Sequence, residues 1–461
     1  MDTKKLRQKI LDLAIHGKLV PQDPNDEPAS VLLERIRAEK EKLIKEGKIK
    51  APKKSKSAGD TSHYPKDVPF AVPEGWVWCS FPEVAELISG QDFPPEKYNT
   101  SAKGTPYIIG ASNIEDGHLR INRWTEYPSV LSQKGDVLVV CKGAGVGKVA
   151  VNDIGTVHIA RQIQAVRIQD EIVSSDFMRI LIDWCVPSIV TQANGLIPGL
   201  KRELLLNVLL PIPPRNEQDL IVSTLCGAFD IIKGMEVEQF NLEVNIRKSK
   251  ERVLELAISG KLVPQDSSEE PAIELLKRIN PDFQPSDNLH YEGVIPDGWQ
   301  ICRLSDLFKV TMGQSPDGTS LNRSTGIEFH QGKICFTEKY LSESDIFTTS
   351  ATKCAEPNSL LCCVRAPVGV FNITSRRICI GRGLCSLSPL DADVDIEYWF
   401  YALSSLTEYY ESMATGSTFK AISGDIIRNT VIAVPPRMEQ KRIFDQITRL
   451  FSVLKEFSDT I

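Results

Sequence analysis

The sequence lacks any apolar run long enough to span a membrane, and no two of its cysteines have the C-x-x-C spacing of many metal and redox sites. A transmembrane helix needs about 18 or more consecutive apolar residues. The N-terminus, Met1-Asp2-Thr3-Lys4-Lys5, opens a charged helix and not a signal peptide. The eleven cysteines are an odd number, which argues against a disulfide framework. We therefore expect reduced thiols in a cytoplasmic protein that does not enter a membrane.

Residue patterns for catalysis are also missing. The six histidines show no metal-ligand spacing, and no cluster of carboxylates and lysine resembles a nuclease site. Pro-Pro occurs at 94–95, 213–214 and 435–436, but Glu or Arg always follows it. The Asn/Asp-Pro-Pro-aromatic motif with which an adenine methyltransferase holds a flipped base is therefore absent. We expect neither a catalytic residue nor a metal in this chain.

An excess of basic residues is missing as well. The 461 residues include 54 Lys and Arg against 60 Asp and Glu, a net charge of −6. Nucleic-acid-binding proteins usually present a basic face, so this balance argues mildly against them. The charge is uneven, however, because residues 1–59 contain 15 basic and 9 acidic residues. Binding to DNA would have to depend on local basic patches or on partner proteins.

What the chain does contain is a large internal repeat. Residues 17–23 and 260–266 both read G-K-L-V-P-Q-D, residues 213–218 and 435–440 read P-P-R-N-E-Q and P-P-R-M-E-Q, and Pro-Glu-Gly-Trp at 73–76 returns as Pro-Asp-Gly-Trp at 296–299. The offsets are 243, 222 and 223 residues, so the first copy holds roughly 20 additional residues before Trp76. Repeats this long exceed the periods of solenoids. They predict a pseudo-two-fold molecule, with two copies of one unit in a single chain.

Residues 215 to about 258 contain no proline and carry a heptad pattern. Eleven consecutive a and d positions fall on this stretch, and nine of them are apolar. A pattern of this length predicts a coiled-coil helix, about 65 Å long, that ends at Gly260. The predicted seam includes Ile221, Leu225, Ile232, Leu242, Ile246, Val253 and Leu256.

The two chain ends continue the same pattern. The offset of 222 relates the last 25 residues to the first half of the central helix, and the offset of 243 relates the first 16 residues to its second half. We expect the two ends to meet in space and to build a second rod, antiparallel to the first. Two unrelated surface helices are the alternative, but they would not keep the heptad phase. The seam residues predicted at the ends are Leu6, Ile10, Leu13, Ile443, Ile447, Leu450, Leu454 and Phe457.

A short helix is expected after each G-K-L-V-P-Q-D motif, over residues 29–44 and 272–279. Pro28 and Pro271 precede these helices at positions typical of a first turn. The first copy then continues into residues 48–56, where five of nine residues are lysine. This composition predicts a flexible basic linker, whose lysines either contact phosphate or are simply solvated.

Each half also contains a globular unit. Short β-type runs separated by Gly, Asn and Asp predict small strands at 136–141, 149–151, 163–168, 360–364 and 384–387. One helix is expected in each unit, over 176–190 and 395–413, before polar loops at 193–199 and 414–424. A hydrophobic strand is expected to run into each Pro-Pro, over 204–214 and 426–436. The predicted fold class is α/β (α+β): two similar globular domains separated by a long antiparallel two-helix coiled coil, in a circularly permuted repeat.

Residues 141–147, C-K-G-A-G-V-G, align with residues 363–369, C-V-R-A-P-V-G, at an offset of 222. The glycines resemble a phosphate loop, but Walker A requires G-x4-G-K-[ST], and here Val149 follows Lys148. We interpret the stretch as a tight turn between strands that brings backbone and lysine close to DNA phosphate. A purely structural turn is the alternative.

These features together resemble the specificity subunit of type I restriction–modification systems. The resemblance rests on the G-K-L-V-P-Q-D repeats, the PPR-x-EQ helix starts and Gly135-Asp-Val-Leu-x3-Lys-Gly-Ala-Gly-Val-Gly-Lys148, and it covers essentially the whole chain. It implies two target recognition domains, each reading one half of a bipartite, asymmetric DNA site. The implied domains are an N-terminal helical region at 1–71, recognition domains at 72–214 and 295–436, a central helical spacer at 215–294 and a C-terminal helix at 437–461.

The resemblance also implies partners. Double-stranded DNA is the expected ligand, two modification subunits that methylate adenine are expected to dock on the helices, and ATP-driven restriction subunits to cleave elsewhere. The chain itself would be non-catalytic and without a cofactor, and S-adenosylmethionine, ATP and magnesium would belong to the partner subunits. A two-domain binding scaffold that does not act on DNA is the alternative, which the acidic net charge keeps open.

Base recognition requires Arg, Lys, Asn and Gln at loop tips, because these side chains distinguish G and A in the major groove. For any single candidate, a solvated surface residue is the alternative. The predicted DNA contacts are Gln91, Asn113, Lys142, Lys148, Arg161, Asn194, Lys201 and Arg202 in the first unit, and Gln314, Gln331, Lys333, Arg365, Arg376, Arg377, Arg382 and Lys420 in the second.

Overall fold

The structure, a computed structural model, describes residues 2–46, 68–143, 145–168, 172–192, 199–286, 289, 291, 293–416 and 420–459. The chain divides into two compact units, Met1–Val237 and Glu238–Ile461, which we call unit 1 and unit 2. The predicted basic linker at 48–56 and Asn194 lie outside the described residues. Among the helices of the described residues, none combines the length and the apolar character that crossing a membrane requires.

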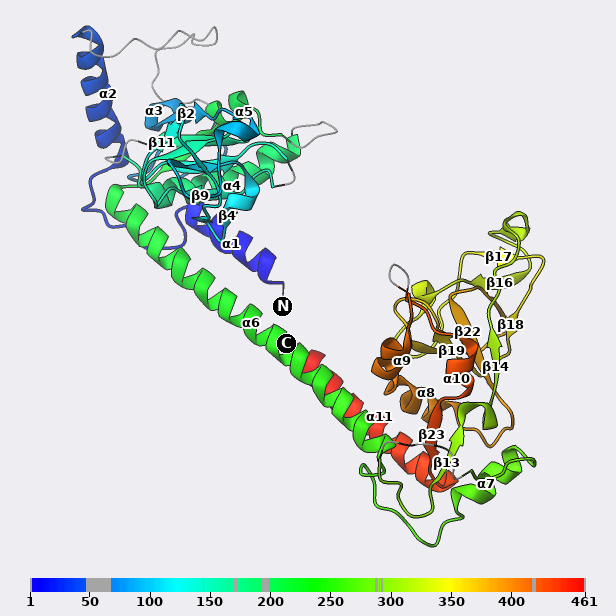
Figure 1. The fold of residues 1–461 in the computed structure, drawn as a ribbon. Coiled ribbons are helices and arrows are strands. Elements are labelled where there is room, and N and C mark those ends of the chain that lie inside the picture. The colour runs from blue at the N-terminus through cyan, green and yellow to red at the C-terminus, as the bar shows by residue number, and fades with distance from the viewer. Residues whose placement is uncertain are drawn as a thin grey trace. The chain divides into compact units, whose positions relative to one another are not determined.

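Unit 1 packs a helix on two stacked sheets (Figure 1). The inner sheet has the order β2-β11-β8-β9 and is antiparallel throughout, with strands at Ala85–Ser89, Ile163–Ile168, Val137–Val140 and Val149–Val151. The outer sheet has the order β6-β3-β10-β7, with strands at Trp124–Thr125, Thr105–Ile108, Val157–Ile159 and Leu131–Ser132. Helix α4, Ser175–Gln192, covers the free face of the inner sheet, close to the predicted 176–190.

The apolar run in β8 explains the layers. Val137 and Val139 belong to the core that contains Phe177 of α4, whereas Leu138 and Val140 belong to a second core that contains β10. Successive strand residues face opposite sides of a sheet. A strand that is buried on both faces therefore reads as a continuous apolar run, as β8 does.

Unit 2 repeats this topology. Its inner sheet, β14-β22-β19-β20, has strands at Phe308–Met312, Leu384–Pro389, Ser359–Cys363 and Phe371–Thr374. Its outer sheet, β15-β17-β16-β21-β18, has strands at Leu321–Asn322, Phe347–Thr348, Ile327–His330, Ile378–Ile380 and Cys354–Ala355. In each unit a further strand pair closes the domain: β1 (Val77–Ser80) with β12 (Leu209–Ile212), and β13 (Gln300–Arg303) with β23 (Val431–Val434). The predicted α/β fold class with two similar domains is confirmed.

Short elements fill the connections between these parts. The helix predicted after the first G-K-L-V-P-Q-D motif is α2, and the helix predicted after the second is α7. Two β hairpin strands, β4 and β5, follow the outer sheet strand β3. The bounds are Ala29–Lys45 for α2, Phe81–Val84 for α3, Ile114–Glu115 for β4, His118–Leu119 for β5 and Ala272–Ile279 for α7.

Three predicted elements are corrected. The single helix expected over 395–413 is two helices, α8 (Ile396–Ser404) and α9 (Thr407–Met413). The break follows from hydroxyl groups that bond to the backbone, since Ser405 donates to Ala402 O and Thr407 donates to Gly369 O outside the helix. The strands expected over 204–214 and 426–436 are shorter, because each is preceded by a helical turn, α5 (Arg202–Leu206) or α10 (Gly424–Arg428).

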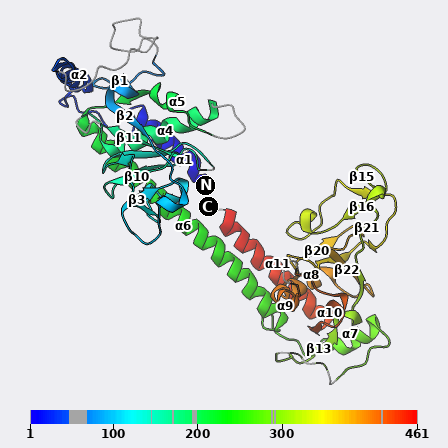
Figure 2. The same cartoon turned by 45° about the horizontal axis from the view of Figure 1, so that its top comes forward.

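The central helix α6 runs from Arg215 to Ile258 without a break, as the heptad pattern predicts. In unit 1 its first half lies beside α1 (Thr3–Ile15), where Arg7 forms a 3.1 Å ion pair with Glu236. In unit 2 its second half lies beside α11, Arg437–Asp459 (Figure 2). Lys250 Nζ of α6 lies 5.2 Å from the ring centroid of Phe451 in α11. The proposed meeting of the two ends concerns Met1 and Ile461, which lie outside the described residues, and it stays a prediction.

The seam is buried in part. Leu13 is 36% exposed, because α1 turns Leu11, Ala14 and Ile15 into the core around α4. Phe457, in the last turn of α11, is 59% exposed and also lies outside a closed seam. Ile221, Leu225, Ile232, Ile443 and Ile447 are buried, and Leu6, Ile10, Leu242, Ile246, Val253, Leu256, Leu450 and Leu454 are half-buried.

The repeated motifs meet at one junction in each unit. In unit 1 the buried carboxylate of Glu217, from PPR-x-EQ, accepts hydrogen bonds from the indole N–H of Trp76 (2.9 Å) and from the amide of Gln22 (3.1 Å) in G-K-L-V-P-Q-D. Gly17 has φ +63°, and a Cβ there would lie 2.3 Å from Pro73 Cγ. The motifs therefore recur because together they build one contact.

The junction of unit 2 has the same geometry. Glu439 accepts hydrogen bonds from Trp299 (2.9 Å) and Gln265 (2.8 Å). Burial raises the pKa of both Glu217 and Glu439, although these hydrogen bonds act in the opposite direction. Each junction ties the start of a long helix to the globular domain of its unit.

Candidate nucleic-acid interface

The Gly-Gln pair repeated in the two units lies where the inner and outer sheets cross. The backbone N–H of Gln91 donates to Ile159 O, and that of Gln314 donates to Ile380 O, each at 2.9 Å. A Cβ on Gly90 would lie 2.1 Å from Ala160 O, so the close approach of two backbones requires glycine. Both glutamines are exposed at this crossing.

Lys142 and Arg365 occupy equivalent places at the ends of β8 and β19. Each forms an isolated backbone bridge, Lys142 with Gly199 and Arg365 with Ala421. Gly199 and Ala421 belong to the predicted polar loops, 193–199 and 414–424, whose sequences differ between the units. The two cations therefore correspond at an offset of 223 residues. The predicted alignment of Cys141 with Cys363 is wrong by one residue, because the turn in unit 2 is one residue shorter.

The other candidates in unit 1 divide into exposed and engaged side chains. Asn113 is 1% exposed, and its amide accepts from Ile109 N–H and donates to Arg120 O, so it holds its own loop together and does not face solvent. Arg161 pairs with Asp92 at 3.3 Å. Three cations, Lys142, Lys148 and Lys201, are exposed and have no acidic partner among the described residues. Gln91 forms a hydrogen bond with Ser129, and Arg202 forms one with Ser89.

In unit 2 the structure brings several predicted residues together. A cavity of about 160 Å³ is lined by Gln331, Lys333 and Arg365, and also by Gly383, the neighbour of Arg382. The backbone carbonyl of Lys420 accepts a hydrogen bond from Ala366, so Lys420 lies beside the same turn. Four of these residues are cations: Lys333, Arg365, Arg382 and Lys420. Among the residues that the structure describes, none of the four has an acidic side chain within 4.0 Å. We call Gln331, Lys333, Arg365, Arg382 and Lys420 the cationic cluster.

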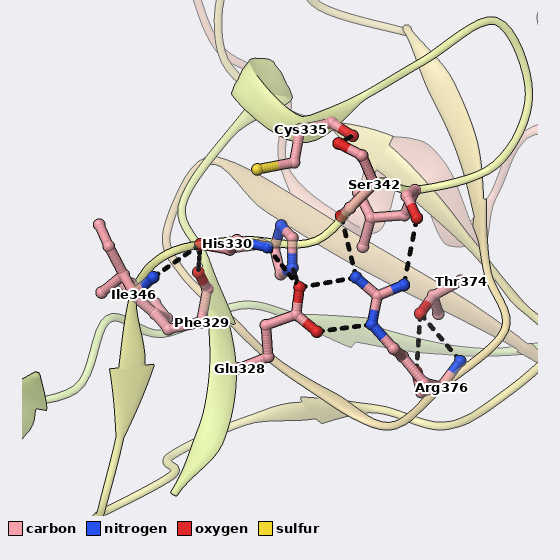
Figure 3. A network of polar contacts seen from close by, with 10 residues as sticks. Glu328, Phe329, His330, Cys335, Ser342, Ile346, Thr374 and Arg376 are labelled. Carbon is pink, nitrogen blue, oxygen red and sulfur yellow. Dashed lines mark hydrogen bonds and ion pairs between the residues drawn. The ribbon is translucent and has the colours of Figure 1, made fainter. Parts of the chain in front are cut away.

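Arg376 and Arg377 are neighbours in sequence with different surroundings. Arg377 is exposed and pairs with Glu356 at 3.3 Å. Arg376 points inward, where Nε and Nη2 donate to the two carboxylate oxygens of Glu328 at 2.5 and 2.6 Å (Figure 3). Two further guanidinium N–H groups bond to the backbone carbonyls of Leu341 and Ser342. Four of the five guanidinium N–H groups of Arg376 thus bond within the protein, and the side chain is 31% exposed.

Glu328 also binds the buried His330, whose Nε2 lies 2.8 Å from Oε1. Burial alone would raise the pKa of Glu328, but hydrogen bonds from Arg376, the Ser344 backbone and His330 outweigh it and lower the pKa to about 2. Burial lowers the pKa of His330, against the opposing effect of Glu328. At neutral pH the cluster is therefore a carboxylate and a guanidinium beside a neutral imidazole.

Sequence reasoning did not identify Glu328 and His330 as partners of Arg376, because they lie 48 and 46 residues away on a different strand. A weak signal was present: Glu328 and His330 alternate along β16, so both point to the same face. No group of three or more His, Cys, Asp or Glu side chains within the described parts of the chain could hold a metal ion.

The chain is similar in sequence to a known family of proteins. Residues 296–460 match the family described as Type I restriction modification DNA specificity domain. The chain is 29% identical to the Type I restriction enzyme EcoAI specificity subunit of Escherichia coli, over 67% of this chain and 63% of that one. It is 26% identical to the EcoEI specificity subunit of Escherichia coli, over 99% of this chain and 90% of that one. This chain resembles the specificity subunits of type I restriction enzymes. The prediction made from the repeated motifs is confirmed.

Solved structures resemble this one in fold. A chain from work on complex assembly and conformational transition of the type I R-M system matches with a TM-score of 0.63 and 24% identity, over 85% of this chain and 95% of that one. The HsdS subunit from Thermoanaerobacter tengcongensis matches with a TM-score of 0.50 and 23% identity, over 84% and 93%. The fold of a specificity subunit therefore extends over both units.

Proposed function

We propose that this chain is the non-catalytic DNA-recognition subunit of a type I restriction–modification complex, in which each globular domain reads one half of a bipartite, asymmetric site. The observation that supports this most is the equivalence of Lys142 and Arg365. Two copies of one frame present an unpaired cation at the same place, next to loops that differ. Such a pair suits two DNA-binding modules with different sequence preferences.

The acidic net charge is compatible with this function because the cations are gathered locally. Lys333 and Arg365 line one cavity, and the backbone of Arg382 and of Lys420 adjoins residues of its lining. Other basic residues are paired with carboxylates, as Arg161 and Arg377 are. Phosphate contacts of this kind give affinity, and amides such as those of Gln314 and Gln331 give base preference.

The proposal includes partners. Two modification subunits would dock on the helices of the two units, with restriction subunits in the full complex, and S-adenosylmethionine, ATP and magnesium would bind to those partners. The repeat supports two copies of one partner, because the same helix and junction occur twice. A cytoplasmic location follows from this function and stays a prediction.

A salt titration tests the proposal. The full chain, together with its modification subunits, should bind a specific duplex with an affinity that falls steeply with salt, because cations displace counterions from phosphate. Alanine at Lys333 and Arg365 should lower the slope by about 0.9 for each phosphate that the protein no longer neutralises. A scaffold that does not act on DNA would show neither sequence preference nor such a slope.

A further inference from the structure

Two residues of the cationic cluster, Gln331 and Lys333, lie on a loop of unit 2 that contains no regular strand. Gln331 and Lys333 follow the end of β16 at His330, and the loop ends in a 3-10 turn at Lys333–Cys335. Gly381 and Gly383 press against it, since a Cβ on Gly383 would lie 2.3 Å from Gln331 O. The direction of the Gln331 and Lys333 side chains therefore depends on what holds the two ends of this loop.

One hydrogen-bonded network, buried at His330 and exposed at Ser342, holds both ends. At the start, the His330 ring bonds to Glu328 at 2.8 Å. At the end, both the backbone N–H and the hydroxyl of Ser342 donate to Cys335 O at 2.9 Å, and Ser342 O in turn accepts from Arg376 Nη2 at 2.9 Å. Arg376 closes the network through its two bonds to Glu328 (Figure 3).

We propose that Arg376 is a positioning residue for DNA recognition: with Glu328 and His330 it fixes the Gln331–Lys333 loop in the shape with which unit 2 reads its half-site. This inference rests on the proposed function. It replaces the direct DNA contact predicted for Arg376, because four of its five side-chain N–H groups bond within the protein. The unpaired cations Lys333, Arg365 and Arg382 remain the contact residues.

Unit 1 holds its equivalent loop in place with a different side chain. This loop follows β3, and buried Asn113 accepts from the backbone of Ile109 and Gly110 while it donates to Arg120 O. In each unit a polar side chain thus ties the loop after the corresponding strand to a later segment, Asn113 in unit 1 and Arg376 in unit 2. The proposal predicts that the two networks act independently, each on its own half-site.

The test compares Arg376→Gln with Arg428→Gln, a matched control that removes the same charge from another arginine of unit 2, one that pairs with Asp425 at 3.0 Å. The full chain in complex with its modification subunits selects from a pool of random duplexes, and affinity for the preferred duplex is measured against salt. Arg365→Ala identifies the half-site read by unit 2. We expect Arg376→Gln to lower base discrimination there by about tenfold or more, while the other half-site and the salt slope stay unchanged. Arg428→Gln should retain the discrimination.

The other results overturn the inference. A salt slope that falls by about 0.9 with base preference retained would make Arg376 a phosphate contact, and unchanged discrimination in a folded variant would leave it without this role. If Arg376→Gln does not fold, Glu328→Gln takes its place, with retained discrimination again the contradicting result. Wild-type complex that selects no sequence would instead overturn the proposed function.

Discussion

At the scale of single residues, the junction between motifs depends on one hydrogen bond to a buried carboxylate. Trp76→Phe keeps most of the apolar contact but removes the indole donor from Glu217. A buried charged group that loses a partner costs about 1.5–3 kcal/mol. We expect the free energy of unfolding to fall by that amount, measured by urea unfolding of the full chain.

Trp124 provides the matched control. Its side chain is half-buried in unit 1 and donates no hydrogen bond within the described residues. Trp124→Phe should therefore cost clearly less than Trp76→Phe. Equal losses for the two variants would mean that apolar packing, and not the hydrogen bond to Glu217, stabilises the junction.

The pH dependence of unit 2 follows from Glu328. Its pKa is about 2 in the folded protein, against an ordinary value of 4.5. The charged carboxylate therefore stabilises the fold above about pH 4.5, and this contribution is lost as the pH falls from 4.5 towards 2. Glu328→Gln should be less stable than wild type at neutral pH, and the difference should shrink on acidification. Unfolding measured at several pH values checks this; a constant difference would contradict it.

At the scale of elements, the central helix contains two glycines that contribute nothing by contact. A Cβ on Gly227 or Gly234 would meet no atom within 4 Å. Glycine inside a helix costs about 0.5–1 kcal/mol relative to alanine. Gly234→Ala should therefore raise the free energy of unfolding by about that amount, as seen in a higher thermal midpoint.

Gly17 is the contrasting position. Its φ is +63°, and a Cβ there would lie 2.3 Å from Pro73 Cγ, an atom of a rigid ring. Gly17→Ala should destabilise unit 1, where Gly234→Ala stabilises. If both substitutions changed stability in the same direction, the assignment of Gly17 to a strained turn at the junction would be wrong.

Periodicity predicted those elements that are set by local pattern. The strand at Ile163–Ile168 and the helix at Ala272–Ile279 have the expected bounds, and α6 has the expected length. The break at Ser405 was missed, because it depends on a bond from Thr407 to Gly369, which is distant in sequence. For the same reason Arg376 was grouped with exposed side chains, since its partner Glu328 is 48 residues away. Asn113 was also grouped with them, because its bonds to Ile109 and Arg120 bury it within a loop, where no periodic pattern reveals burial.

At the scale of the whole molecule, the repeat predicts that the two chain ends can be joined by a linker and the chain opened at the equivalent connection in the other half. A linker between Ile461 and Met1, with new termini opened between Gly260 and Glu270, should give a chain that still folds. It should also bind its modification partner and DNA. A permuted chain that folds but binds neither would contradict the predicted meeting of the ends.

The central claim is that two domains read separate half-sites and that the helix α6 sets the distance between them. DNA presents the same groove face about every 34 Å, and four inserted helical residues add about 6 Å. The most direct measurement maps the sequence recognised by the wild-type complex and by a variant with four residues inserted near Gln239. We expect unchanged half-sites with a spacer altered by one or two base pairs. Binding should be lost if the modification subunits cannot adapt to the longer helix. Altered half-sites with an unchanged spacer would contradict the claim.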